Sequence, residues 1–119
     1  MVKFRFQDLE IWKLSIEIGD ELFNIADGLE QRKYFRWAEQ LRASGLSMSN
    51  NIAEGSGSSS DKDFARFLEF AKKSTFENAN VLYVIHRRKL ISENARDNLL
   101  EKLDHLCRKT MNFMKTLRA

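Results

Sequence analysis

The fold is set by residues 40–55, which read Gln-Leu-Arg-Ala-Ser-Gly-Leu-Ser-Met-Ser-Asn-Asn-Ile-Ala-Glu-Gly and lead into Ser-Gly-Ser-Ser-Ser at residues 56–60. Within this stretch, Asn51 and Glu54 lie one helical turn apart, among small and apolar residues, just before a helix must stop. Polar side chains in such a position either hold a fold together or carry its chemistry. We interpret both as structural, because the rest of the sequence offers them no catalytic partner.

Helix is the expected state of nearly the whole chain. Its 119 residues include no proline and only five glycines, and this length suits one domain spanning residues 1–119. Breaks at Asp27-Gly28, at Gly55 to Ser60 and near Leu90 to Ser92 divide it. They predict four helices, over residues 7–28, 32–55, 61–89 and 93–117. Short connections make successive helices antiparallel, so the predicted fold is all-α: an antiparallel up-down four-helix bundle.

The first and third predicted helices carry wider apolar arcs than one core needs. In the first helix, a stripe through Trp12 and Phe23 predicts the core seam, and a second stripe lies beside it. Such an excess favours a subunit interface. A charge at Ile18 or Leu22 is accordingly expected to separate subunits without unfolding them. The candidate interface residues are Ile11, Ile18, Leu22, Ile25, Phe67 and Phe70.

Asn51 and Glu54 are expected to meet the third helix, because antiparallel helices joined by a short loop bring together residues equally far from that loop. The expected structural polar network comprises Asn51, Glu54, Ser74 and Glu77. Glu54 and Glu77 also suggest a general acid and base pair, but no nucleophile or histidine accompanies them. We therefore predict a non-enzymatic role, with Gly55 in the left-handed conformation that ends a helix.

Neither a metal nor a cofactor is expected. A di-iron bundle needs Glu-x-x-His pairs on two helices, and His86 and His105 lack such partners. The serine-rich residues 56–60 follow no strand and lack the Gly-Lys-Ser/Thr ending of a phosphate-binding loop, so they are predicted to be a connector. The sequence has no long apolar run, so neither a membrane span nor a secretion signal is predicted. Cys107 is the single cysteine, so no internal disulfide is possible. A cytoplasmic protein is expected.

Three segments resemble one known family. They are residues 40–55, Phe-Gln-Asp-Leu-Glu-Ile-Trp at residues 6–12, and Phe-Ala-Arg-Phe-Leu-Glu-Phe-Ala at residues 64–71. Together they are similar to the small bacterial "four helix bundle protein" family, first noticed as proteins encoded in intervening sequences of 23S ribosomal RNA genes. The resemblance covers nearly the whole chain. Ala43 and Ser49 depart from it, since an arginine and a proline are common at these places.

The resemblance implies an up-down bundle that assembles into a barrel-like ring, commonly a homopentamer, with a basic surface. More distantly, the chain is similar to accessory proteins of diversity-generating retroelements, which bind nucleic acid and a reverse transcriptase. The partners implied are therefore further copies of the chain, RNA or DNA, and a protein such as a reverse transcriptase. The resemblance implies no defined reaction.

Basic residues gather where two helix ends should meet. In an antiparallel bundle the start of the second helix lies beside the end of the third, which predicts a basic rim of Arg32, Lys33, Arg36, Arg87, Arg88 and Lys89. Nearby carboxylates would dilute its charge, namely Asp27, Glu30, Glu93 and Asp97. Phe35 and Trp37 beside Arg36 are candidates for base stacking, although packing in the core or in an interface also explains them.

Two functional hypotheses follow. In the first, a homo-oligomeric ring binds RNA or DNA mostly through phosphates, since no motif that reads base sequence is present. In the second, the ring is a scaffold or accessory subunit for a protein partner, and its formal charge of +3 serves only solubility. Charge reversal at Arg87, Arg88 and Lys89 distinguishes the two.

Overall fold

The last two helices begin at serine caps. In the computed structural model, which describes residues 1–118, a 3₁₀ turn precedes the first helix, and Ser60 and Ser92 each accept a backbone amide of the following turn through Oγ at 3.1 Å. Serine is among the preferred N-cap residues, so the sequence itself favours a helix start at both places. No strand occurs in the part of the chain described. The elements are the 3₁₀ turn Arg5–Asp8, α1 Glu10–Gln31, α2 Phe35–Ser56, α3 Asp61–Arg87 and α4 Glu93–Arg118.

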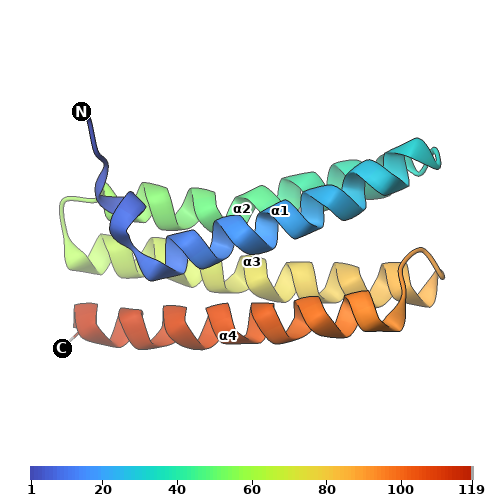
Figure 1. The fold of residues 1–119 in the computed structure, drawn as a ribbon. Coiled ribbons are helices and arrows are strands. Elements are labelled where there is room, and N and C mark those ends of the chain that lie inside the picture. Colours follow the sequence, from blue (N-terminus) through green and yellow to red (C-terminus); the bar gives the residue numbers. More distant parts are fainter. Residues whose placement is uncertain (119) are drawn as a thin grey trace.

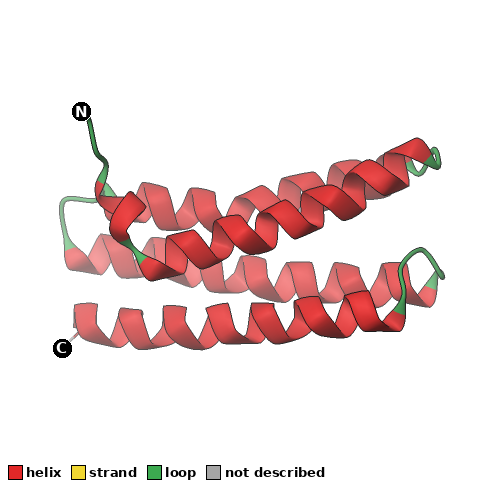
Figure 2. Cartoon of the chain, in the orientation of Figure 1, coloured by secondary structure: helices red, strands yellow, loops and turns green. Residues whose placement is uncertain are grey.

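The four helices form an up-down antiparallel bundle (Figure 1). α1 and α2 form one layer, α3 and α4 form the other, and only short loops connect successive helices (Figure 2). The α1–α2 and α3–α4 turns lie at the same end of the bundle, whereas the α2–α3 loop lies at the opposite end with the start of the chain. The predicted all-α fold is therefore confirmed.

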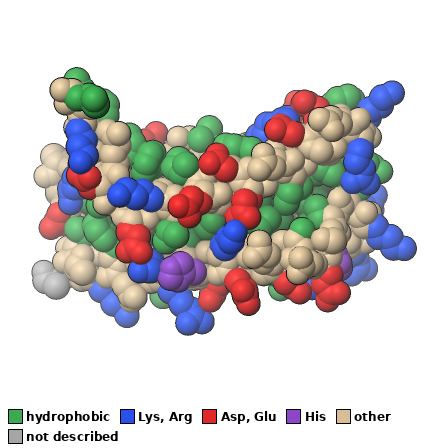
Figure 3. All heavy atoms as spheres, in the orientation of Figure 1, with side chains coloured by type: hydrophobic (Ala, Val, Ile, Leu, Met, Phe, Trp, Pro, Cys, Tyr) green, Lys and Arg blue, Asp and Glu red, His purple; other side chains and the backbone are tan. Residues whose placement is uncertain are grey.

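One apolar core joins the two layers. It draws buried side chains from all four helices, including Leu22, Leu41, Leu68, Leu82 and Leu106. The seam between α1 and α4 is looser than those between the other neighbouring helices. Hydrophobic side chains are visible between these two helices in the space-filling view (Figure 3). Two ion pairs bridge this seam, Lys102–Glu21 at 2.8 Å and Lys109–Glu10 at 2.9 Å.

No helix within residues 1–118 carries an apolar stretch long enough to span a bilayer.

The first helix break lies later than the sequence predicts. α1 continues through Gly28 to Gln31, and α2 begins at Phe35. The extra turn buries Leu29, which is only 2% exposed, and this burial outweighs the poor helix propensity of Gly28. α1 also begins at Glu10 rather than at residue 7, because residues 5–8 form the 3₁₀ turn.

The side of α1 that faces the core is also not the predicted one. Ile11, Ile18 and Leu22 are 4%, 2% and 0% exposed within a single chain, so their assignment to a subunit interface is wrong. Trp12 and Phe23, predicted to form the seam, are only half-buried. Periodicity places both stripes on α1 but does not say which one meets the other helices. A charge at Ile18 is therefore expected to unfold the chain.

Small residues let α2 approach both of its neighbours closely. A Cβ atom added to Gly19 of α1 would lie 3.1 Å from the carbonyl oxygen of Gly45, so the two helix backbones nearly touch. On the other side, the fully buried Asn78 of α3 donates from Nδ2 to the carbonyl oxygen of Ser44 at 2.8 Å. This direct bond fixes the register of α2 against α3.

Gly55 serves close packing and not a left-handed turn. It lies inside α2, and no glycine in residues 1–118 has a positive φ, so the predicted left-handed conformation is wrong. A Cβ atom at Gly55 would lie 2.7 Å from Phe67 Cβ and 2.9 Å from Phe64 Cδ1. Because Phe67 Cβ is attached directly to the α3 backbone, it can move away only if the helix moves.

Replacing Gly55 with alanine is expected to destabilise the bundle by about 1–3 kcal/mol, because the new methyl group forces α2 and α3 apart. Gly28→Ala is the matched control. Nothing lies within 4 Å of a Cβ at Gly28, and alanine there should stabilise α1 by about 0.5–1 kcal/mol. Chemical denaturation measures both changes. A Gly55→Ala protein as stable as the wild type would contradict this packing.

Candidate nucleic-acid interface

The two turns at one end of the bundle bring the predicted basic residues together. A direct hydrogen bond joins these turns, since Arg32 Nη1 donates to the carbonyl oxygen of Leu90 at 3.2 Å. Lysine and arginine side chains gather at this end in the space-filling view (Figure 3). We call the following set the basic rim, and all six side chains are exposed: Arg32, Lys33, Arg36, Arg87, Arg88 and Lys89.

The carboxylates of α1 near the rim are held by an arginine outside it. Arg42 of α2 pairs with Asp27 at 2.6 Å and with Glu30 at 2.9 Å. Hydrogen bonds to these carboxylates, with Asp27 as the stronger partner, raise the pKa of the Arg42 guanidinium above its usual value. Arg42 thus offsets one of the two negative charges expected to dilute the rim.

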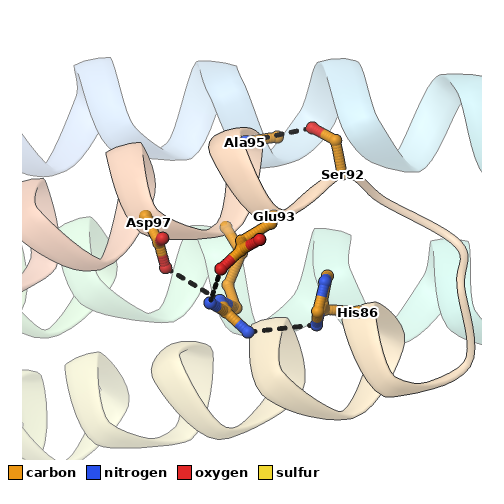
Figure 4. A network of polar contacts seen from close by, with 6 residues as sticks. His86, Ser92, Glu93, Ala95 and Asp97 are labelled. Carbon is orange, nitrogen blue, oxygen red and sulfur yellow. Dashed lines mark hydrogen bonds and ion pairs between the residues drawn. The ribbon is translucent and has the colours of Figure 1, made fainter.

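Arg96 does the same for the carboxylates of α4 (Figure 4). Its guanidinium lies 2.8 Å from Asp97 and 3.5 Å from Glu93, and the Asp97 hydrogen bond is the main cause of a raised Arg96 pKa. It also contacts His86 Nδ1 at 3.0 Å and lies 5.4 Å from the centre of the Tyr83 ring. His86 is therefore part of a polar cluster between α3 and α4.

The cations of the basic rim have no carboxylate partner among the described residues. No ion pair found within residues 1–118 involves a rim side chain, whereas all four neighbouring carboxylates are paired. α2 also begins at the rim with no acidic residue in its first turn, so no carboxylate offsets the positive end of its dipole. The rim is therefore more electropositive than its sequence neighbourhood suggests.

The α1–α2 turn and the α3–α4 turn each have a lysine in the left-handed conformation at the tip. Lys33 and Lys89 have φ values of 68° and 63°, in the left-handed region that favours glycine. In each turn, the amide of the next residue donates back to the helix: Tyr34 to Leu29 at 2.8 Å and Leu90 to Ile85 at 2.9 Å. Two turns thus carry lysine where glycine would be less strained, and both lysines belong to the rim.

The aromatic residues predicted near the rim separate into two kinds. Phe35 is 55% exposed, whereas Trp37 is partly buried and packs against the core. Tyr34, which the sequence argument missed, is 41% exposed beside Phe35. A position in the turn between α1 and α2 would have indicated that Tyr34 is exposed. The predicted second helix began at residue 32, so Tyr34 was placed inside that helix.

The predicted polar network is only partly assembled. Asn51 donates to the Ser47 carbonyl at 2.9 Å, and Ser47 Oγ contacts Ser74 Oγ at 2.7 Å, so Asn51 and Ser74 are linked through Ser47. Glu54 is wrong as a member, because it is exposed and its side chain makes no hydrogen bond or ion pair within residues 1–118. Glu77 is also outside the network.

Glu77 instead lies on the surface, where it accepts a hydrogen bond from Gln40 at 3.3 Å. The sequence argument also missed Asn78 as the central polar residue. Its Nδ2 joins the Ser44 and Ser74 carbonyl oxygens, and its buried Oδ1 has no partner among the described residues. Glu54 and Glu77 therefore do not form the acid and base pair that their spacing suggested.

The remaining surface offers weaker candidates. A hollow of about 810 Å³ lies at the opposite end, between the start of α3 and the end of α4. Two of its charged residues, Asp63 and Arg66, already pair with each other at 2.9 Å. Within residues 1–118, no three His, Cys, Asp or Glu side chains gather as a metal site requires, and His105 is exposed. The rim is the strongest candidate site in this part of the chain.

The fold and the rim define the class: an all-α four-helix bundle protein with an electropositive end. Residues 7–112 match the family described as 23S rRNA-intervening sequence protein, and the chain belongs to that family. The family resemblance seen in the sequence is thereby confirmed. The similarity to retroelement accessory proteins stays a prediction.

A solved structure is similar to this chain over most of its length. It is the crystal structure of a protein of unknown function from the S23 ribosomal protein family of Bacteroides thetaiotaomicron VPI-5482. The TM-score is 0.83 at 23% sequence identity, and the match covers 88% of this chain and 98% of that chain. It shows that the two proteins share a fold. No curated protein matches this sequence.

Replacing Lys33 or Lys89 with glycine is expected to raise the free energy of unfolding by about 0.5–1 kcal/mol, because glycine adopts a positive φ without a Cβ penalty. Lys33→Ala and Lys89→Ala are the controls, since alanine removes the cation and keeps the penalty. Urea denaturation measures the difference. Equal stability of the glycine and alanine variants would show that these two backbones are not strained.

Proposed function

We propose that this protein is a non-enzymatic, homo-oligomeric bundle that binds the phosphates of RNA or DNA through the basic rim. The observation that carries the proposal is the sorting of charge at one end of the molecule. Six exposed cations have no ion pair there, while Arg42 and Arg96 hold the neighbouring carboxylates. Unpaired, solvated cations are the groups that phosphate contacts use.

The two lysines in left-handed turns support a functional role for the charge. A residue other than glycine in this conformation lowers stability, and both Lys33 and Lys89 have it. Strained residues are found most often where function requires them. Charge on the two turn tips is consistent with that pattern, because solubility alone would be served by cations placed anywhere on the surface.

Self-association would multiply the rim. The family resemblance implies a ring, commonly a pentamer, and each copy would add a formal charge of +3 and one rim to the assembly. Several modest phosphate sites on one particle bind a long polyanion far more tightly than one site does. This proposal places the protein in the cytoplasm, with RNA or DNA as its partner.

Exposed apolar side chains indicate where subunits would meet. Of the interface candidates from the sequence, Ile25 and Phe67 are half-buried and Phe70 is exposed, so these three remain available. A further strip runs along the flank shared by α3 and α4. It contains Phe76, Tyr83 and Met111, which are 65%, 54% and 41% exposed, with Cys107 beside Phe76. We call these four residues the α3–α4 flank.

The α3–α4 flank also favours a second function. An apolar strip of this kind suits a protein partner as well as another copy of the chain. In that case the protein is an interaction scaffold or accessory subunit, for example of a reverse transcriptase, and its cations do not bind nucleic acid. Loss of rim charge should abolish nucleic-acid binding under the first proposal and leave binding of the protein partner largely intact under the second.

Reversing the charges of Arg87, Arg88 and Lys89 to glutamate is expected to abolish nucleic-acid binding. The control variant reverses Lys13, Lys62 and Lys115, which are exposed at the opposite end, so both proteins have the same net charge. Titrations with labelled RNA and duplex DNA at about 50 mM and 200 mM salt measure affinity, and the wild type should weaken steeply between them. Equal loss in both variants would show a non-specific effect of net charge.

Phe76→Glu is expected to reduce the assembled mass in solution while changing the free energy of unfolding by no more than about 0.5 kcal/mol, because Phe76 is mostly exposed. Ile18→Glu should instead unfold the chain, since it places a charge in the core. Asn24→Glu adds the same charge to the exposed surface of α1 and serves as a control. Light scattering and circular dichroism separate these effects. If Phe76→Glu keeps the wild-type mass, the α3–α4 flank is not the interface.

A further inference from the structure

Two adjacent exposed aromatic residues lie between cations at the rim. Residues 32–36 read Arg-Lys-Tyr-Phe-Arg and span the turn between α1 and α2. Tyr34 and Phe35 are 41% and 55% exposed, and the three basic residues of this stretch are exposed as well. Large aromatic side chains are usually at least partly covered in a folded chain, so two adjacent exposed rings within a cationic surface suggest a ligand that uses both.

Tyr34 is more exposed than the residue at the matching position of the α3–α4 turn. In this type of turn, the residue after the left-handed one packs against the preceding helix. Leu90 has that place in the α3–α4 turn and is only 8% exposed, whereas Tyr34 has it in the α1–α2 turn and is 41% exposed. The amides of both residues donate to corresponding carbonyl oxygens of the preceding helix, so the two positions share this hydrogen bond although their exposure differs.

Tyr34 is also held in place. Its amide donates to the Leu29 carbonyl at 2.8 Å, which fixes its backbone. The Arg32 guanidinium lies 5.2 Å from the centre of the Tyr34 ring and donates to the Leu90 carbonyl, so the cation that contacts the ring is itself anchored to the other turn. A ring fixed in this way loses little freedom when a ligand packs on it.

We propose that the basic rim binds single-stranded nucleic acid, with unpaired bases stacking on Phe35 and Tyr34 while the rim cations contact the adjacent phosphates. This inference rests on the proposed function and names its substrate class. Cations alone would bind duplex and single strand through the same phosphates. Aromatic rings add affinity only for bases whose faces are free, which a duplex does not offer.

The test compares three probes of equal length: oligouridylate RNA, an RNA duplex, and an abasic strand that keeps the phosphates but has no bases. The wild-type protein is expected to bind oligouridylate about fivefold or more tightly than the abasic strand. Phe35→Ala should weaken oligouridylate binding by a similar factor and leave binding of the abasic strand unchanged. Tyr34→Ala is expected to act in the same direction.

Two further variants keep the test decisive. Phe35→Trp retains a stacking surface and should bind oligouridylate as tightly as the wild type. Phe4→Ala removes a ring that is 61% exposed at the opposite end of the bundle and should change nothing. Circular dichroism confirms that each variant is folded, which the exposure of Phe35 leads us to expect.

The outcomes separate this inference from the proposal beneath it. If all three probes bind equally well and Phe35→Ala changes none of them, stacking is overturned and phosphate binding by the rim stands. That result would assign the two rings to another partner, such as a protein. If the wild-type protein binds no probe at all, the proposed function itself fails and the inference fails with it.

Discussion

The close contact of α2 with its two neighbours is the constraint on which the rest of the structure depends. Gly45 allows the backbones of α1 and α2 to meet near Gly19, and Gly55 lies against Phe64 and Phe67 with no room for a side chain. Because these contacts fix both the separation and the register of α2, they also fix where its first turn lies. That first turn carries Arg36 and follows Arg32 and Lys33, and these three residues are one half of the basic rim.

Two arginines outside the rim pair with the carboxylates that lie near it. Arg42 and Arg96 each bind two carboxylates, and both pKa values are raised by those contacts. The pairs lie on the surface, where each contributes little stability. Their larger effect is to halve the negative charge near the rim, whose turn tips carry lysines in a conformation that favours glycine.

Much of the fold follows from the sequence, and the failures have identifiable causes. The absence of proline and the caps at Ser60 and Ser92 predict the helices correctly, because these signals act locally. The end of α1 and its core-facing stripe were wrong, because burial of Leu29 and contact with two helices are tertiary effects. At the site, topology predicts the clustering of the basic residues, but no sequence signal shows that Arg42 and Arg96 bind the acids or that Tyr34 remains exposed.

The central claim is that nucleic acid binds at the end of the bundle formed by the α1–α2 and α3–α4 turns. Photo-crosslinking of the protein to a thiouridine-containing RNA strand, followed by mass spectrometry of the linked peptides, locates the contact directly. The account predicts crosslinks in the peptides that contain Tyr34 and Phe35 and in those that contain residues 87–89. Crosslinks confined to the α3–α4 flank or to the opposite end of the bundle would contradict it.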